Sequence, residues 1–270
     1  MINGPEYRQF HDHKIYPSTA GFFIRDGGRL VCRGSGTFVS IGKIHGLLTC
    51  AHALKVIEKQ TQVHLALFPV RPAERTFPLN VKEHCDHVIF GPSGDEHGPD
   101  IGFLRLPSPF FSSISQLVSV KSLEIGRTDA FATAEPSDES ITAVVGMIHE
   151  WTEGDETGQN FDVRGLMNIG NISQDRIISD DGYDRFLFQP VPDENFREPG
   201  CVDGRRYSGT SGGGLWRIYP KPRDGGDIAY RLIGVAFYEM SDHQIMCHGQ
   251  ASIYLKLFDA IRDKWPDAVE

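Results

Sequence analysis

The sequence predicts a protein of β-barrels or β-sandwiches that ends in a single long helix. Short runs rich in Val, Ile, Phe and Thr, bounded by Gly, Pro, Asn or Asp, recur along its 270 residues. Helical periodicity is clear in only two segments, residues 51–59 and residues 252–265. Many short strands with one long terminal helix favour an all-β fold over a doubly wound sheet.

The predicted strands follow one another at short intervals. Each combines β-branched or aromatic residues with a turn signal at its ends, which is typical of strands that pack into a core. They cover residues 21–25, 28–34, 36–41, 45–49, 63–70, 101–106, 141–148, 183–189 and 230–240. No internal repeat is visible, and the less apolar stretch 124–140 marks a link between two halves.

The carboxyl-terminal segment has the periodicity of an amphipathic helix. One face holds five apolar residues, Tyr254, Leu257, Phe258, Ile261 and Trp265, and Pro266 ends the pattern. We expect this face to pack on the body of the protein.

Composition narrows the classes of partner. The chain carries 27 Lys and Arg against 36 Asp and Glu, a formal charge of -9, and has no basic run that could follow a phosphate backbone. No segment reaches the length of a membrane span, and the amino terminus lacks the apolar region of a signal peptide. Five cysteines, an odd number, argue against a secreted disulfide framework. We therefore expect a cytoplasmic protein that binds neither nucleic acid nor membranes.

The stretch YSGTSGGGLW, residues 207–216, contains a candidate nucleophile. Its four glycines indicate a backbone that follows an unusual path, because glycine tolerates positive φ and close approach. Taken alone, the stretch fits a flexible turn as well as a loop that presents the hydroxyl of Ser211.

A serine hydroxyl becomes nucleophilic when a histidine takes its proton and a carboxylate orients that histidine. His52 stands where the apolar run LLTC meets a short helix, and Asp100 opens the strand 101–106 after a loop rich in Gly and Pro. Each residue alone also fits a structural role, as a helix-start histidine or a strand-end aspartate. Together with Ser211 they occur in the order His, Asp, Ser, which favours a catalytic triad.

Three segments, LLTCAHAL, DIGFLRLP and GTSGGGLW, resemble the signature blocks of the trypsin-like (chymotrypsin-fold) serine peptidases. The resemblance is closest to intracellular bacterial members and the HtrA-type catalytic domain. It implies two six-stranded antiparallel barrels with the active site between them. The first would cover residues 1–123 and carry His52 and Asp100, and the second, residues 124–270, would carry Ser211 and the terminal helix.

The same resemblance assigns roles to residues. His52 matches the general base, Asp100 the orienting acid and Ser211 the nucleophile, and the backbone N–H groups of Gly209 and Ser211 match the oxyanion hole. Thr210 replaces the aspartate that a trypsin zymogen uses on activation, so we expect a site formed without that cleavage.

The substrate pocket is predicted from the same comparison. The position that matches its floor is Arg205, which favours an acidic substrate side chain. Phe237, Tyr238 and Glu239 match a pocket wall that offers its backbone to an extended substrate, and Glu239 argues for the opposite charge. A solvated loop around Arg205 is the plainer interpretation of that residue.

Two rival interpretations involve other residues. The sequence GTSGG also fits the nucleophile elbow of α/β-hydrolases, with Asp242, His243 and His248 as later partners, but that motif requires a helix directly after the serine. The Gly- and Pro-rich segment that follows Ser211 makes such a helix unfavourable. The cluster 84–87, HCDH, has metal-ligand residue types, but without a second spaced pair it predicts a polar turn.

The sequence as a whole predicts a serine endopeptidase that cleaves protein or peptide substrates through an acyl-enzyme, with no metal or organic cofactor. The absence of a zymogen device leaves room for an activating partner protein and for a bacterial stress or defence role. The alternative is a protease-fold module that binds proteins without catalysis.

Overall fold

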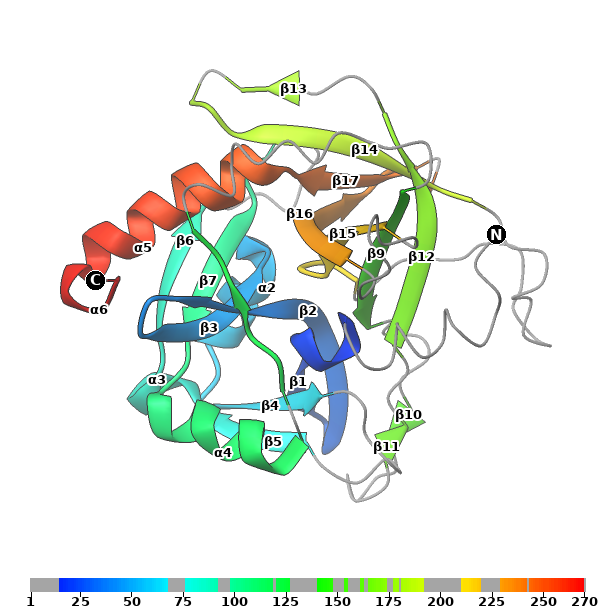
Figure 1. Cartoon of the computed structure of the whole chain (residues 1–270). Helices are drawn as coiled ribbons and strands as arrows, with labels where there is room; N and C mark the ends of the chain where they lie inside the picture. Colours follow the sequence, from blue (N-terminus) through cyan, green and yellow to red (C-terminus); the bar gives the residue numbers. More distant parts are fainter. Residues whose placement is uncertain are drawn as a thin grey trace.

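Strand pairing in the computed structural model groups the described strands into two large β-sheets and one small hairpin, with a helical segment at the carboxyl end (Figure 1). The structure describes residues 15–67, 76–91, 98–118, 120–126, 140–147, 153–154, 161–162, 165–173, 177–179, 181–191, 210–219, 229–241 and 243–269. The predicted predominance of strands is confirmed. Within these ranges, no helix is both long enough and apolar enough to span a membrane.

The amino-terminal sheet contains eight strands in the order β5-β4-β1-β2-β3-β7-β6, with β8 paired in parallel to β2. Their bounds are β1 Thr19–Asp26, β2 Arg29–Ile41, β3 Ile44–Thr49, β4 Gln62–Leu67, β5 Thr76–Asn80, β6 Asp86–Phe90, β7 Ile101–Arg105 and β8 Leu123–Glu124. No pairing of β5 with β6 is found in the described ranges, so the closed six-stranded barrel predicted for this half is not confirmed. The predicted domain boundary, between 123 and 124, falls inside β8.

The second sheet closes on itself. Its order is β12-β9-β15-β16-β17-β14-β13, and an additional pairing of β12 with β14 completes a six-stranded antiparallel barrel. The bounds are β9 Ile141–Met147, β12 Gly165–Ile172, β13 Ile177–Ile178, β14 Asp184–Pro190, β15 Gly214–Tyr219, β16 Ala229–Glu239 and β17 Ile245–His248. A small hairpin, β10 Glu153–Gly154 with β11 Phe161–Asp162, lies apart from it in the pairing. Closure pairs β12 with β14, which leaves fewer unpaired strand edges in this half.

Two local predictions were wrong. Residues 28–34 and 36–41 were expected as separate strands, but they form the single strand β2, with an irregular register opposite Phe22 and Phe23. Helix α4, Ser108–Val118, was not predicted, because Ser and Phe are only moderate helix formers and just Ile114 is fully buried. Two short helical segments, η2 Tyr16–Ser18 and α3 Val81–His84, complete the amino-terminal half.

One hydrophobic core crosses both sheets. The largest cluster of buried side chains includes Phe23 and Leu48 from the first sheet, Met147 and Trp216 from the second, and Ile253 from the terminal helix. Burial of apolar surface is the main stabilising contribution to folding. The two halves are therefore held together by a shared core.

The terminal helical segment consists of η6 Ser252–Leu257, a wider π-helical stretch, followed by α5 Phe258–Lys264 and α6 Pro266–Val269. The predicted apolar face is confirmed: three of its residues are buried and Phe258 and Trp265 are partly buried. Ile253, which was not part of the predicted face, is buried as well. In Figure 1 this segment runs from the closed barrel past β6 and β7, so it contacts both halves.

Candidate active site

The predicted base, His52, is the second residue of α2, Ala51–Glu58, which follows β3 after Cys50. Its ring is held at the helix start with one third of the side chain exposed, 33%. The predicted short helix over 51–59 is thus confirmed, and it places His52 at a junction of strand and helix.

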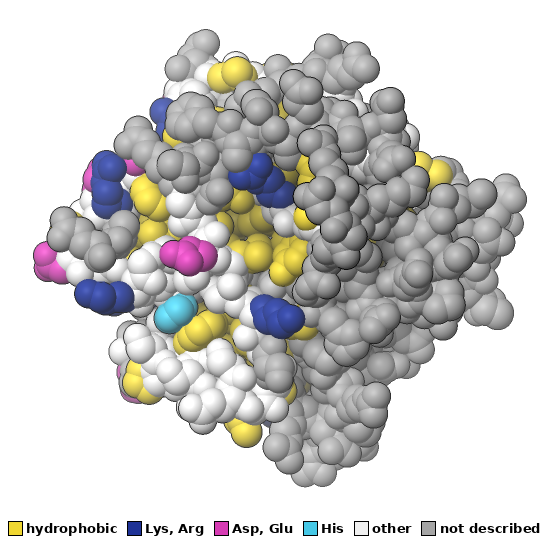
Figure 2. Space-filling view, viewed as in Figure 1, with side chains coloured by type: hydrophobic (Ala, Val, Ile, Leu, Met, Phe, Trp, Pro, Cys, Tyr) yellow, Lys and Arg dark blue, Asp and Glu magenta, His cyan; other side chains and the backbone are white. Residues whose placement is uncertain are grey.

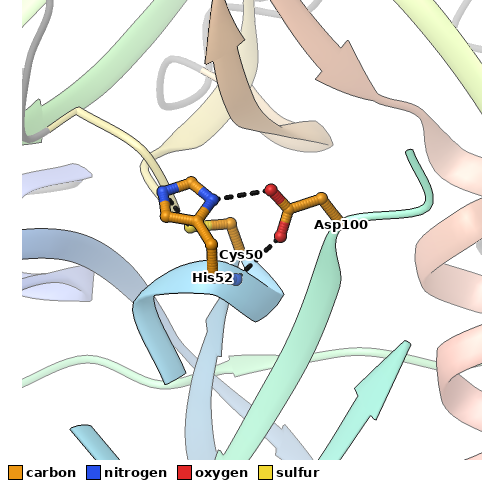
Figure 3. A group of neighbouring side chains, drawn as sticks. All are labelled: Cys50, His52 and Asp100. Atoms are coloured by element: carbon orange, nitrogen blue, oxygen red, sulfur yellow. Dashed lines mark hydrogen bonds and ion pairs between the residues drawn. The ribbon is translucent and has the colours of Figure 1, made fainter. Parts of the chain in front are cut away.

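Asp100 approaches His52 from the amino end of β7 and is fully buried. Figure 3 shows both of its carboxylate oxygens directed at the same residue. The backbone N–H of His52 donates to Oδ1 at 2.8 Å, and Nδ1 lies 2.6 Å from Oδ2. These two bonds fix both the backbone and the ring of His52, and they place a proton on Nδ1 so that Nε2 is the basic nitrogen.

The charges around His52 change its pKa. Burial of the ring lowers the pKa, while the neighbouring Cys50 sulfur and the Asp100 carboxylate raise it, and the net result is a pKa of about 10. The imidazolium form is therefore strongly stabilised at this site.

The Ser211 loop is a tight turn that leads into β15. The Gly213 N–H donates to the Thr210 carbonyl at 2.7 Å, which puts Ser211 and Gly212 at the two central positions. Gly212 has a φ of +86°, the conformation that a type II turn requires at its third residue. Ser211 itself is half-buried, and a strand follows it, so the helix required by the α/β-hydrolase motif is absent at this described position.

The turn is hydrogen-bonded to β2, and β2 is bonded to the end of β3, the strand that leads to His52. The Ser211 carbonyl accepts a hydrogen bond from the Ser35 N–H at 2.7 Å, and the Thr49 hydroxyl donates to the Ser35 carbonyl at 2.6 Å. A Cβ atom on Gly34 would lie 2.9 Å from the Ala53 Cβ and 3.1 Å from the Ser211 carbonyl oxygen. Ser211 and the residue after His52 therefore flank the same point of β2.

Cys50 is a site residue that was not predicted as one. Its Sγ lies 3.5 Å from His52 Nε2, and the residue is fully buried. Cys50, His52 and Asp100 also form the one group among the described residues whose ligand atoms are close enough to hold a metal ion. Both carboxylate oxygens of Asp100 are already bonded to His52, so it is better suited to orient the histidine than to bind a metal directly. The position of Cys50, two residues before His52, was the available sequence signal.

The predicted pocket residues are only partly placed. Arg205 and Gly209 lie outside the described residues. Phe237 is buried and stacks on His248, with ring centroids 4.3 Å apart, while Tyr238 and Glu239 are partly exposed on β16. A register shift between Ala236 and Tyr238 marks a bulge at this point. Phe237 is thus found in the core beneath the site.

Other predicted residues have partners away from the site. In the cluster 84–87, Asp86 lies 2.6 Å from the Lys264 ammonium, and His87 Nε2 lies 3.1 Å from a Glu58 carboxylate oxygen. His243 Nδ1 is 3.3 Å from a Glu239 oxygen, and Asp242 lies outside the described residues. The four described cysteines, at positions 32, 50, 85 and 247, are free thiols.

The face of the molecule that is seen in Figures 1 and 2 carries both apolar and charged side chains. Figure 2 shows hydrophobic side chains gathered in a hollow near the centre of the view, with basic and acidic side chains around it. In Figure 1 the strand β16 lies in this region. The hollow provides apolar surface on this face of the molecule.

Comparisons with known proteins give a limited result. No family model matches the chain, and no curated protein matches it. One similar solved structure comes from work on aromatic interactions that drive the coupled folding and binding of the intrinsically disordered Sesbania mosaic virus VPg protein. It is 13% identical, with 89% of this chain and 90% of that chain covered and a TM-score of 0.46.

A second similar structure is catalytically active tobacco etch virus protease complexed with product. It is 12% identical, with 87% of this chain and 73% of that chain covered and a TM-score of 0.42. Both TM-scores lie below 0.5.

Proposed function

We propose that this protein is a serine endopeptidase that hydrolyses peptide bonds of protein or peptide substrates. The observation that carries the proposal is the pair of hydrogen bonds that the Asp100 carboxylate accepts from the backbone and the ring of His52. A buried carboxylate that fixes the tautomer of a partly exposed histidine is the arrangement that general-base catalysis by Nε2 needs.

In the proposed reaction, the deprotonated form of His52, whose fraction grows as the pH rises toward its pKa of about 10, accepts the hydroxyl proton of Ser211 at Nε2 while the Ser211 Oγ attacks the peptide carbonyl. Asp100 stabilises the resulting imidazolium, which then gives the proton to the leaving amine. The acyl-enzyme is hydrolysed by water through the same histidine. The backbone N–H groups of Gly209 and Ser211 are proposed to hold the oxyanion, and a lost donor of this kind costs about 3 kcal/mol of barrier stabilisation.

The proposed substrate lies extended along β16. The partly exposed residues Tyr238 and Glu239 follow the bulge at Phe237. An extended peptide can add its backbone to such a segment and place a side chain in a neighbouring hollow.

Cys50 supports a second candidate, a cysteine-type hydrolase, because its sulfur is 3.5 Å from His52 Nε2. Ser211 is the better nucleophile candidate, since it is half-buried on a tight turn while Cys50 is fully buried. A substrate carbonyl must reach the attacking atom, and burial opposes that approach for Cys50.

A fluorophosphonate probe tests the proposal directly. We expect the wild type and Cys50→Ala to be labelled, with the modified peptide containing Ser211, and Ser211→Ala to lose labelling. Labelling that persists in Ser211→Ala would contradict the serine mechanism. Loss of peptide hydrolysis in Cys50→Ala alone, with Ser211→Ala still active, would favour the cysteine-type reaction. No hydrolysis by the wild type, with retained peptide binding, would favour the binding module.

A further inference from the structure

His248 contacts the candidate site from the opposite half of the molecule. The backbone N–H of Asp100 donates to His248 Nε2 at 2.9 Å, although the two residues are 148 positions apart. Asp100 precedes β7 of the amino-terminal sheet, and His248 ends β17 of the closed barrel. Both residues are fully buried.

The Asp100 amide needs this acceptor because strand pairing does not supply one. The ladder with β6 ends at Ile101 and the ladder with β3 ends at Gly102, so Asp100 lies just outside both. A buried N–H group without a partner costs about 1–3 kcal/mol. A side chain that reaches in from the barrel meets this need at the residue whose carboxylate holds His52.

His248 is in the protonation state that this bond requires. Burial of the ring lowers the pKa of His248 to about 4, so the ring is neutral near pH 7. To accept at Nε2, the neutral ring carries its proton on Nδ1, which faces the Ser252 hydroxyl oxygen at 3.3 Å. Phe237 stacks on the ring and fixes its plane.

Behind His248, Ser252 is clamped on Asp184. The Ser252 N–H and hydroxyl both reach the Asp184 Oδ1, at 2.7 and 2.8 Å, and the Asp184 N–H donates to the Ser252 Oγ at 3.0 Å. Asp184 begins β14 and Ser252 begins the terminal helical segment, and both are fully buried. The His248 ring is therefore held in place by β14 and η6, through Asp184 and Ser252, and by β16, through Phe237.

We propose that His248 is a positioning residue of the active site, which holds the Asp100 backbone from the closed barrel so that the Asp100 carboxylate meets His52. This inference rests on the proposed function and deepens it. The series of hydrogen bonds from Asp184 through Ser252 and His248 to Asp100 links the position of the Asp100 carboxylate to the packing of the two halves. His248 touches neither the substrate nor the reacting atoms.

The matched variants His248→Gln and His248→Asn test the proposal. Both carry an amide, but the longer Gln reaches the position of Nε2 and the shorter Asn does not. For His248→Asn we expect kcat for peptide or ester hydrolysis to fall by up to about 100-fold with KM nearly unchanged, because the acid is displaced. We expect His248→Gln to recover most of kcat. The control is His64→Ala. It removes a buried histidine of the amino-terminal sheet that is bonded to Thr76, and it should keep wild-type kcat.

Two NMR measurements separate this proposal from the proposed function. A scalar coupling between the Asp100 amide nitrogen and His248 Nε2 should be present in the wild type. The pKa of His52 should fall in His248→Asn and stay near the wild-type value in His248→Gln and His64→Ala. A wild type that neither hydrolyses peptides nor reacts with fluorophosphonate defeats the proposed function, yet these measurements still decide on His248.

The proposal is overturned if the coupling is absent, or if folded His248→Asn keeps the kcat and the His52 pKa of the wild type. If neither amide variant folds, the coupling in the wild type decides alone.

Discussion

At the residue scale, two histidines on either side of Asp100 have opposite properties. His52 contacts the carboxylate of Asp100, and the pKa of His52 is raised. His248 contacts the backbone N–H of Asp100, and the pKa of His248 is lowered to about 4. Burial lowers the pKa of both rings, but the Cys50 sulfur and the Asp100 carboxylate together raise the pKa of His52 above its ordinary value. One histidine thus holds a proton beside the carboxylate, and the other is a fixed neutral acceptor of a hydrogen bond.

The raised pKa of His52 predicts how stability depends on pH. A group with a pKa raised on folding contributes stability below its unfolded pKa, about 6.5, and this contribution is lost as the pH rises through the folded value. The folded value is about 10. We expect the free energy of unfolding to fall more steeply between these two pH values in the wild type than in His52→Gln. Denaturant titrations at a series of pH values measure this difference, and parallel curves would contradict the raised pKa.

At the element scale, the loop that presents Ser211 is shaped by close packing as much as by its turn type. A Cβ atom on Gly212 would overlap the Thr49 hydroxyl and the Ser35 carbonyl oxygen, and its φ is +86°. The Gly212 N–H also donates to the Ala236 carbonyl at 2.7 Å, which ties the turn to β16. The glycine therefore allows β2, β3 and β16 to meet the turn.

Gly212→Ala should destabilise the protein more than Gly28→Ala. Gly28 has nearly the same φ, +88°, but nothing lies within 4 Å of its Cβ position. An alanine in this conformation costs about 1–2 kcal/mol, and only the Gly212 variant adds the overlap with backbone and side chain. Chemical denaturation of the two variants measures the difference. Equal destabilisation would show that the close packing around the turn is unimportant.

At the scale of the whole molecule, the two sheets share a core and a terminal helix. The Met147 side chain from β9 lies against Gly21 of β1, and the Met147 N–H donates to the Ser35 hydroxyl at 2.7 Å. The Tyr254 hydroxyl of η6 donates to the Leu232 carbonyl of β16 at 2.8 Å, and the Arg105 guanidinium lies 5.1 Å from the centre of the Trp265 ring. These contacts predict that the two halves unfold together.

Met147→Ala tests that cooperativity. The fully buried side chain lies between the sheets, and its truncation should cost about 2–5 kcal/mol. The control Leu117→Ala removes an apolar side chain that is 63% exposed and should change stability by less than about 0.5 kcal/mol. Probes placed in each sheet should report one coincident transition in both variants. Separate transitions would show that the halves fold independently.

The sequence predicted local features well where one element carried the signal. The apolar, β-branched runs 141–148 and 230–240, and the periodic face around Tyr254, each reflect burial within a single strand or helix. Helix α4 escaped prediction because its burial is slight. The contact of His248 with Asp100 could not be predicted, since it depends on a partner brought close by folding.

By itself, the sequence determined the mostly β architecture, the terminal helix and the candidate residues His52, Asp100 and Ser211, because periodicity and motif spacing are local properties of the chain. Only the tertiary structure decided that the second sheet closes and that Phe237 is buried. It also decided that His52 contacts the Asp100 carboxylate while His248 contacts the Asp100 backbone N–H. Strand order and contacts between residues 148 positions apart depend on how complete elements pack, and no single segment contains that information.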